Sequence, residues 1–478
     1  MTDSWVNSAE GLGRDLHLDL SGSGGRRAAL TRALRDAVRS GRLTSGTRLP
    51  PYRSLAADLG MARNTVADAY AELVAEGWLT ARQGSGTRVA DRTAPPPAAE
   101  PARAPTARPA FDLRQGQPHT GSFPRTAWLA AARRALTAAP NDAFGPGDPR
   151  GRIELRRALA GYLSRSRGVR TSPERIVVCS GFAHGLRLLA ALPQIRRGPM
   201  AVESYGLPFH RGILDAAGLR TVPLPVDERG ADTAGLAATR ARGVLLTPAH
   251  QFPTGVPLHP ARRAAAVGWA RAADGLVLED DYDGEFRYDR QPVGAVQGLD
   301  PERVVYLGSA SKSLSPALRL GWMALPAHLV DTVVAAKGER EPTVSGLDQL
   351  TLAEFIESGG YDRHLRGMRQ RYRRRRDQLA ATLAEHAPHI ELTGVAAGLH
   401  AVLRLPPDTE QTALKAAALQ GLALDPLSDY RHPAAPTHTG PEDHYPASDG
   451  LVVGFAAPPD HAFTATLTAL RRSLPPAP

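Results

Sequence analysis

One lysine in this chain stands where amine chemistry is expected. Lys312 lies in residues 308–321 (GSASKSLSPALRLG), directly after the apolar run 304–307, which predicts a buried strand leading into a small-residue loop. Of the 58 basic residues only Lys312, Lys337 and Lys415 are lysine, and the rest are arginine. An amine can lose its proton and form a Schiff base with a carbonyl, whereas a guanidinium stays protonated. A lysine retained in this loop therefore indicates carbonyl chemistry.

Phosphate-binding groups surround this lysine in the sequence. Ser309 and Ser311 supply hydroxyls and Arg319 supplies a guanidinium, which together suit a phosphate. A Schiff-base lysine beside a phosphate site is typical of pyridoxal 5'-phosphate (PLP). The alternative is a loop lysine whose neighbouring serines cap a helix.

Composition predicts a protein of two to three domains with a large core, because the chain has 478 residues. Its 42% hydrophobic and 22% charged residues are those of a soluble globular protein. No apolar run could span a bilayer, and the N-terminus lacks a signal-peptide pattern. The single cysteine, Cys179, excludes an internal disulfide and fits a reducing cytoplasm. We therefore expect a cytoplasmic protein with no membrane partner.

The positive charge is concentrated near the N-terminus. Net charge is +10, and residues 26–89 hold eleven arginines against five acids, so this segment supplies +6 of it. Such a segment favours an anionic partner, above all nucleic acid.

The same segment predicts a helix-turn-helix followed by a wing. A helix over residues 27–40 precedes a short helix ended by Gly60, and a third helix begins at Asn64 or Thr65. The third helix suits the DNA major groove. Residues 77–89 predict two short strands around a Gly-rich turn. The alternative is a helical module whose basic face binds protein.

Residues 24–90 resemble the GntR-type winged helix-turn-helix domain. The resemblance rests on Leu49-Pro50 before the second helix and on the wing motif Arg82-Gln-Gly-x-Gly-Thr. It implies binding to double-stranded DNA at promoter half-sites. The positions that match DNA-contacting residues of that family are Arg53, Arg63, Asn64, Thr65, Arg82 and Gly84.

The remaining chain predicts a linker and an α/β architecture. Residues 91–110 are rich in Pro and Ala and predict a semi-rigid spacer that lets its two flanking domains move. A large domain over 111–360 alternates apolar runs with helical patterns, which predicts a mostly parallel sheet covered by helices. Ligand groups then gather at the carboxyl ends of its strands. A small α+β domain over 361–478 follows. The predicted strands of the large domain are 175–179, 200–203, 243–246, 276–279 and 304–307.

Polar residues follow several of these strands. Ser180 and Gly181 open a helix whose first amides suit a phosphate, and Tyr205 is placed to cover a flat ligand. His184, on the same helix, is predicted to be structural because nothing near it in the sequence pairs with it. Residues 279–283 (EDDYD) hold four acids, which repel one another unless a cation sits among them. A protonated pyridine nitrogen is such a cation, and a divalent metal ion is the alternative.

These motifs together resemble fold-type I aminotransferases, and their fusion to a GntR-type module resembles the MocR class of bacterial transcription regulators. The resemblance spans nearly the whole chain from Arg26 and implies PLP and a homodimer. It assigns Lys312 as the aldimine lysine, Asp280 as partner of the pyridine nitrogen, and Tyr282 as donor to the ring hydroxyl. Tyr205 would stack on the ring. The phosphate would be held by Ser309, Ser311, Arg319 and the amides of Gly181 and Phe182.

Three departures from the enzyme pattern bear on activity. Phe252 stands where such enzymes place an asparagine that touches the ring hydroxyl. Residues 144–149 offer no tyrosine to reach a neighbouring subunit's phosphate, and the apolar run 451–456 lacks an arginine for a substrate carboxylate. We therefore expect cofactor binding without ordinary transamination.

The C-terminal part predicts two further charged features. Residues 363–385 form a long basic helix with Arg373 to Arg376, interpreted as a solvated face or dimer edge rather than a second DNA surface. Arg431 is a weak candidate for an effector anion. Strands are expected at 398–404 and 451–456, and helices at 410–420 and 462–474.

These observations predict a PLP-binding transcription regulator that senses PLP itself, an amine or an amino acid through Lys312. The competing hypothesis is a working aminotransferase that carries a DNA-binding module. A third is a cofactor-free dimerisation scaffold, which does not explain why lysine persists at position 312.

Overall fold

A computed structural model provides the coordinates. The chain divides into two compact units, Met1–Ala107 and Arg108–Pro478. Within the part of the chain that is described, no helix is both long and apolar enough to cross a membrane. The described residues are 18–20, 25–82, 86–91, 109–116, 118–288, 293–338, 344–435 and 449–477.

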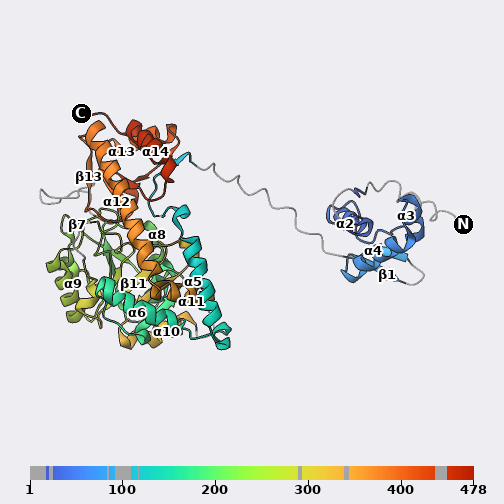
Figure 1. Ribbon diagram of the computed structural model, residues 1–478, viewed down its shortest axis with the longest axis horizontal. Coiled ribbons are helices and arrows are strands. Elements are labelled where there is room, and N and C mark those ends of the chain that lie inside the picture. The colour runs from blue at the N-terminus through green and yellow to red at the C-terminus, as the bar shows by residue number, and fades with distance from the viewer. Residues whose placement is uncertain are drawn as a thin grey trace. The chain divides into compact units, whose positions relative to one another are not determined.

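The first unit is a helix-turn-helix with a wing, as predicted (Figure 1). α4 begins at Arg63, slightly before the expected start, and the wing strands pair antiparallel from Leu79↔Val89 to Arg82↔Gly86. The Tyr70 hydroxyl donates to the Pro50 carbonyl (3.0 Å) and so fixes the approach to α3. The elements are α2 (Arg26–Arg39), α3 (Tyr52–Asp58), α4 (Arg63–Ala75), β1 (Leu79–Arg82) and β2 (Gly86–Val89).

The second unit is built on a seven-stranded sheet in the order β4-β12-β11-β10-β9-β5-β6. Only β12 runs antiparallel to its neighbours, so the mostly parallel sheet is confirmed. The apolar runs predict five strands and miss β6 and β12. β6 contains Pro223 and lies at the edge, where a missing backbone donor is tolerated. The strands are β4 (Ile176–Cys179), β5 (Met200–Glu203), β6 (Thr221–Leu224), β9 (Gly243–Leu246), β10 (Leu276–Asp280), β11 (Val304–Ser309) and β12 (Gly321–Ala324).

Amphipathic helices cover this sheet and bury two apolar clusters against it. A third cluster joins the sheet to α6, α11 and the C-terminal elements. The helices are α5 (Arg125–Ala138), α6 (Ile153–Arg167), α7 (Phe182–Ala190), α8 (Pro208–Ala216), α9 (Pro260–Ala272), α10 (Val330–Lys337) and α11 (Gly346–Glu357).

The C-terminal part holds an antiparallel sheet in the order β13-β14-β17-β16. β3 (Phe111–Asp112) pairs with β15 (Leu422–Ala423), so the first strand after the linker lies with the C-terminal elements. In Figure 1 the long helix α12 (Gly360–His386) runs from these elements toward α11. The others are β13 (Glu391–Thr393), β14 (His400–Arg404), α13 (Glu410–Leu419), β16 (Asp425–Pro426), β17 (Gly450–Gly454) and α14 (Asp460–Ser473).

The basic helix α12 is a brace as well as a solvated face. Arg375 is 3% exposed and donates to the carbonyls of Phe455, Ala456 and Pro458, at 3.1, 2.8 and 2.5 Å. It also pairs with Asp460 at 2.7 Å. The expectation of a solvated face holds for Arg373, which is 64% exposed, and is wrong for Arg375. The sequence cannot separate the two, because the carbonyls that Arg375 satisfies lie about eighty residues away.

Replacement of Arg375 should weaken the second unit more than replacement of Arg373. Arg375→Met leaves buried carbonyls without donors, so we expect the free energy of unfolding to fall by about 2–4 kcal/mol. Arg373→Met should change it by less than about 0.5 kcal/mol. Urea unfolding of both full-length variants, followed by circular dichroism, measures the difference. Equal stability would contradict the bracing role of Arg375.

Candidate functional site

A cavity opens where the carboxyl ends of the parallel strands meet. Asp280 at the end of β10 pairs in register with Leu307 of β11, so the acidic run and the Lys312 loop leave the sheet together. The cavity brings all nine predicted cofactor residues into one lining: Gly181, Phe182, Tyr205, Asp280, Tyr282, Ser309, Ser311, Lys312 and Arg319.

The Lys312 side chain is placed for amine chemistry. Its Nζ donates to the carbonyl oxygen of Gly116, which also lines the cavity. Burial lowers the pKa of Lys312, and the carboxyl groups of Asp283 and Asp280 oppose that shift. A lowered pKa raises the fraction of neutral amine, which is the form that attacks a carbonyl.

The acidic run is neutralised mostly by the protein itself. Arg167, at the end of α6, makes a bidentate ion pair with Asp281 at 2.6 and 2.9 Å, and the Tyr306 hydroxyl donates to the same carboxylate. Glu279 accepts hydrogen bonds from the backbone amides of Val296 and Gln297. Sequence reasoning missed Arg167, which lies 114 residues before its partner.

Asp280 differs from its neighbours. It is 4% exposed, lines the cavity and has no hydrogen-bond or ion-pair partner among the described residues. Burial and the nearby Asp281 and Asp283 carboxyls raise its pKa well above the ordinary value. A protonated pyridine nitrogen would supply the missing partner, so the residues present fit PLP. A metal ion would need several oxygen ligands, and Glu279 and Asp281 are already engaged.

The turn at the start of α7 offers hydrogen-bond donors that could hold a phosphate. Gly181 has φ +79°, and the amides of Phe182 and Ala183 have no acceptor among the described residues. Arg319 reaches this turn by donating to the Ser180 carbonyl at 2.8 Å. A Cβ at Gly321 would lie 2.7 Å from the Gly181 Cα, so glycine is required where β12 meets the turn.

His184 is structural, as predicted. Its Nδ1 accepts a hydrogen bond from the Ser180 amide at 3.1 Å, and it does not line the cavity. Burial lowers its pKa, which favours the neutral form that can accept.

Aromatic and imidazole groups also line the cavity. Tyr205 is 3% exposed, and the Phe252 ring lies edge-on to Tyr282 with centroids 6.0 Å apart. The Tyr282 hydroxyl contacts His250, which sequence reasoning did not assign to the site. The sequence did contain one signal for His250, because this histidine lies in the turn-rich run that follows the predicted strand 243–246.

One group of buried side chains could in principle hold a metal ion. Within the described residues, donor atoms of His250, Asp283 and His400 lie within 4.8 Å of one another. Nδ1 of His250 is already hydrogen-bonded to Asp283, and Nε2 of His400 to the Pro253 carbonyl. We therefore treat the group as a hydrogen-bonded cluster.

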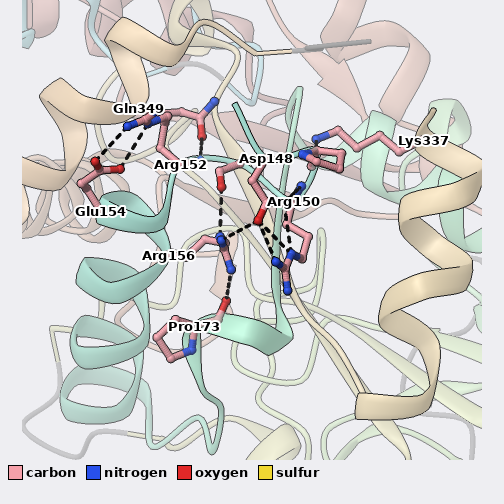
Figure 2. A network of polar contacts seen from close by, with 10 residues as sticks. Asp148, Arg150, Arg152, Glu154, Arg156, Pro173, Lys337 and Gln349 are labelled. Atoms are coloured by element: carbon pink, nitrogen blue, oxygen red, sulfur yellow. Dashed lines mark hydrogen bonds and ion pairs between the residues drawn. The ribbon is translucent and has the colours of Figure 1, made fainter. Parts of the chain in front are cut away.

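The loop before α6 is fixed by a polar network. Figure 2 shows Asp148 between Arg150 and Arg156, at 2.7 and 3.0 Å. Lys337 donates to the carbonyls of Pro149 and Val178 and so ties the loop to β4. Lys337 thus has a structural role as a hydrogen-bond donor, in contrast to Lys312, which lines the cavity.

β17 lacks the arginine that would bind a substrate carboxylate, and the two arginines nearby are engaged elsewhere. Arg431 donates to the Ala435 carbonyl and does not line the cavity. Arg211 lines it, but its guanidinium holds the carbonyls of Gly206, Tyr430 and Arg431. Residues of β17 are apolar and buried.

The predicted DNA-contacting residues gather around the helix-turn-helix. Arg63 and Asn64 are exposed in the first turn of α4, and Thr65 is half-buried beside them. Arg53 is exposed near the start of α3, and Arg82 is exposed on β1. Gly84 lies outside the described residues. Glu72 and Glu76, near the other end of α4, pair with arginines of α2. The exposed start of α4 therefore keeps its positive charge.

Two family models match the chain. Residues 27–89 match the model described as bacterial regulatory proteins, gntR family. Residues 108–434 match the model described as aminotransferase class I and II.

Curated relatives share both parts. The HTH-type pyridoxine biosynthesis transcriptional regulator PdxR of Corynebacterium glutamicum is 34% identical, covering 90% of this chain and 91% of its own. The probable rhizopine catabolism regulatory protein MocR of Rhizobium meliloti is 32% identical, covering 88% of each. The HTH-type transcriptional regulator TauR of Rhodobacter capsulatus is 33% identical, covering 86% of this chain and 91% of its own.

Solved structures support the fold of the second unit. Pyrococcus horikoshii kynurenine aminotransferase aligns with a TM-score of 0.67 at 22% identity, covering 77% of this chain and 91% of its own. The multiple substrate aminotransferase of Thermococcus profundus gives 0.67 at 23% identity, with 77% and 92% covered. The chain therefore belongs to the MocR class of GntR-family transcription regulators, in which a winged helix-turn-helix domain precedes a fold-type I aminotransferase domain.

Proposed function

We propose that the second unit binds PLP at Lys312 and that binding there changes how the first unit holds DNA. The observation that carries this proposal is the unpartnered Asp280 carboxyl, buried in the same cavity as the Lys312 amine. A buried carboxyl without a partner is costly in a folded protein, and a cationic ring nitrogen removes that cost.

The cavity residues have separate tasks in this proposal. When bound, PLP supplies an aldehyde carbon that amines can attack. Lys312 would present its amine to that carbon, and Asp280 would hold a proton at the ring nitrogen. The amides of Phe182 and Ala183, with Gly181, Ser309, Ser311 and Arg319, hold the phosphate. Tyr205 stacks on the ring and Tyr282 donates to its hydroxyl.

In this proposal the C-terminal elements adopt a more open and a more closed arrangement over the cavity. Ligand binding regulates the protein because the two arrangements bind the ligand unequally. The ligand that exchanges at Lys312 is PLP itself, a small amine or an amino acid. Relatives named for pyridoxine biosynthesis and for rhizopine catabolism support a range of small molecules across this class. The Pro-rich residues 91–110 would pass the change to the DNA-binding unit, in the cytoplasm.

A homodimer is part of the proposal. Large apolar side chains are exposed on α5, on the turn before α6 and at the start of α11, at Leu129 (67%), Phe144 (56%) and Leu347 (45%). α5 and α11 pack together, and α11 contacts the turn that holds Phe144. A second copy covering these elements would place two winged helices on two promoter half-sites.

The cofactor is tested by absorbance. Full-length protein mixed with PLP should show a visible band near about 410–430 nm, because the Lys312 amine bonds the cofactor's aldehyde. Lys312→Ala should lack that band, whereas Lys415→Ala, a change at an exposed lysine of α13, should keep it. No band in the wild type, or an equal band in Lys312→Ala, would contradict the proposed site.

The DNA interface is tested with two matched charge deletions. Arg63→Ala should weaken binding to a DNA fragment selected from a random pool by about 5–100-fold, because Arg63 is exposed in the first turn of α4. Arg32→Ala removes the same charge from an exposed position in the middle of α2 and should weaken binding by less than about 3-fold. Fluorescence anisotropy at fixed salt measures both affinities. A larger loss of affinity in Arg32→Ala than in Arg63→Ala would indicate that α2, and not α4, contacts the DNA.

The competing function is amino-acid transamination, favoured by the fold and by the buried lysine in the cavity of this chain. Phe252 and the apolar β17 argue against it. With PLP and mixed amino-acid and keto-acid pools, turnover should lie at least about 100-fold below the usual enzyme range of about 1–10³ per second. Chromatographic detection of new amino acids, with Lys312→Ala as the blank, measures this. Turnover within the usual range would establish the enzyme.

A further inference from the structure

Two buried residues outside the predicted cofactor set hold the Tyr282 hydroxyl. Nδ1 of His250 lies 3.0 Å from the Tyr282 oxygen and 2.9 Å from Asp283 Oδ2. The Tyr282 hydroxyl donates in turn to the His250 carbonyl at 3.0 Å. The side chains of His250 and Asp283 are 3% and 1% exposed, so water does not compete for these bonds.

These contacts determine where the protons lie. A carboxylate only accepts hydrogen bonds, so Nδ1 of His250 carries the proton that Asp283 accepts. The same N–H reaches the Tyr282 oxygen, which therefore acts as an acceptor toward His250. The phenolic proton is left free for an acceptor elsewhere, and in this structure that acceptor is the His250 carbonyl.

The surrounding backbone leaves room for this pair. Gly398 has φ +73°, and a Cβ there would lie 2.3 Å from His250 Cε1 and 2.6 Å from Asp283 Oδ2. The neighbouring Phe252 ring offers no polar atom, and the His400 ring stacks on Tyr282 with its Nε2 bound to the Pro253 carbonyl. Of the three neighbouring rings, only that of His250 therefore hydrogen-bonds to the Tyr282 hydroxyl.

We propose that His250 and Asp283 are positioning residues that hold Tyr282 as a hydrogen-bond donor to the ring-hydroxyl oxygen of PLP. This inference rests on the proposed function. His250 accepts no substrate and touches no reacting atom; it acts through Tyr282. With the Tyr282 oxygen held as an acceptor on the His250 side, the phenolic proton is free to turn from the His250 carbonyl to the ring oxygen of a bound PLP, where it would stabilise negative charge.

The surroundings of Tyr282 favour its protonated hydroxyl. Burial raises its pKa well above the ordinary value, and the nearby carboxyl groups act in the same direction, so the hydroxyl stays a donor. The titratable groups that surround it are Glu203, His250, Asp280, Asp283, Lys312 and His400.

The test measures the visible absorbance band of the PLP-loaded protein as a function of pH. The quantity compared is the midpoint, the pH at which half of the band is lost. A weaker donor makes the ring oxygen more basic, so the proton shared between that oxygen and the Lys312 nitrogen is held to higher pH. His250→Gln should raise the midpoint by about one pH unit, the size of one hydrogen bond to a charged group. His389→Gln is the matched control, because His389 bonds the Pro475 carbonyl and does not line the cavity. It should leave the midpoint unchanged.

A double-variant cycle distinguishes positioning from a direct role. Tyr282→Phe should raise the midpoint, and adding His250→Gln to Tyr282→Phe should raise it no further. Additive shifts would overturn the inference. His250→Asn provides the same test if His250→Gln fails to fold. A band with an unchanged midpoint in both variants would overturn only this inference, whereas absence of any band in the wild type would overturn the proposed function with it.

Discussion

The burial of five carboxyl groups within seven residues is the constraint on which the second unit depends. Residues 279, 280, 281, 283 and 285 are all acidic, and each is at most 8% exposed. Charges buried this way are tolerated only with partners. A guanidinium from α6, two backbone amides, one imidazole and the Tyr162 hydroxyl supply partners for four of them. Asp280, which faces the cavity, is left for a ligand.

The two units of the chain differ in the sign and the exposure of their charged residues. The first unit concentrates exposed positive charge at the start of α4 and suits a polyanion. The second unit concentrates buried negative charge at a strand end and suits a small cation that also carries a phosphate. In the proposed function, the amides at the start of α7 and the unpaired Asp280 carboxyl, which share one cavity, would hold the two ends of one PLP molecule.

Sequence patterns predict the parts of this molecule that are local. The apolar runs identify five strands of the large sheet, and turn glycines identify the helix-turn-helix and the phosphate turn. They miss β12, whose short run continues the Lys312 motif, and the pairing of β3 with β15. They also miss Arg167, Arg375 and His250, because a side chain's partner across the fold leaves no periodicity in the sequence. The acidic run 279–283 correctly indicated that a cation lies among its carboxyl groups. For Asp281 that cation is Arg167, which is distant in the sequence.

The proposed control of DNA binding by the Lys312 cavity can be tested directly by one measurement. The affinity of the full-length protein for a selected DNA fragment should be measured with and without PLP, for wild type and Lys312→Ala. We expect PLP to change the wild-type Kd by about 5-fold or more, in the range of ordinary allosteric coupling, and to leave the variant unchanged. Equal wild-type affinities, or the same change in both proteins, would contradict a sensor that acts through Lys312.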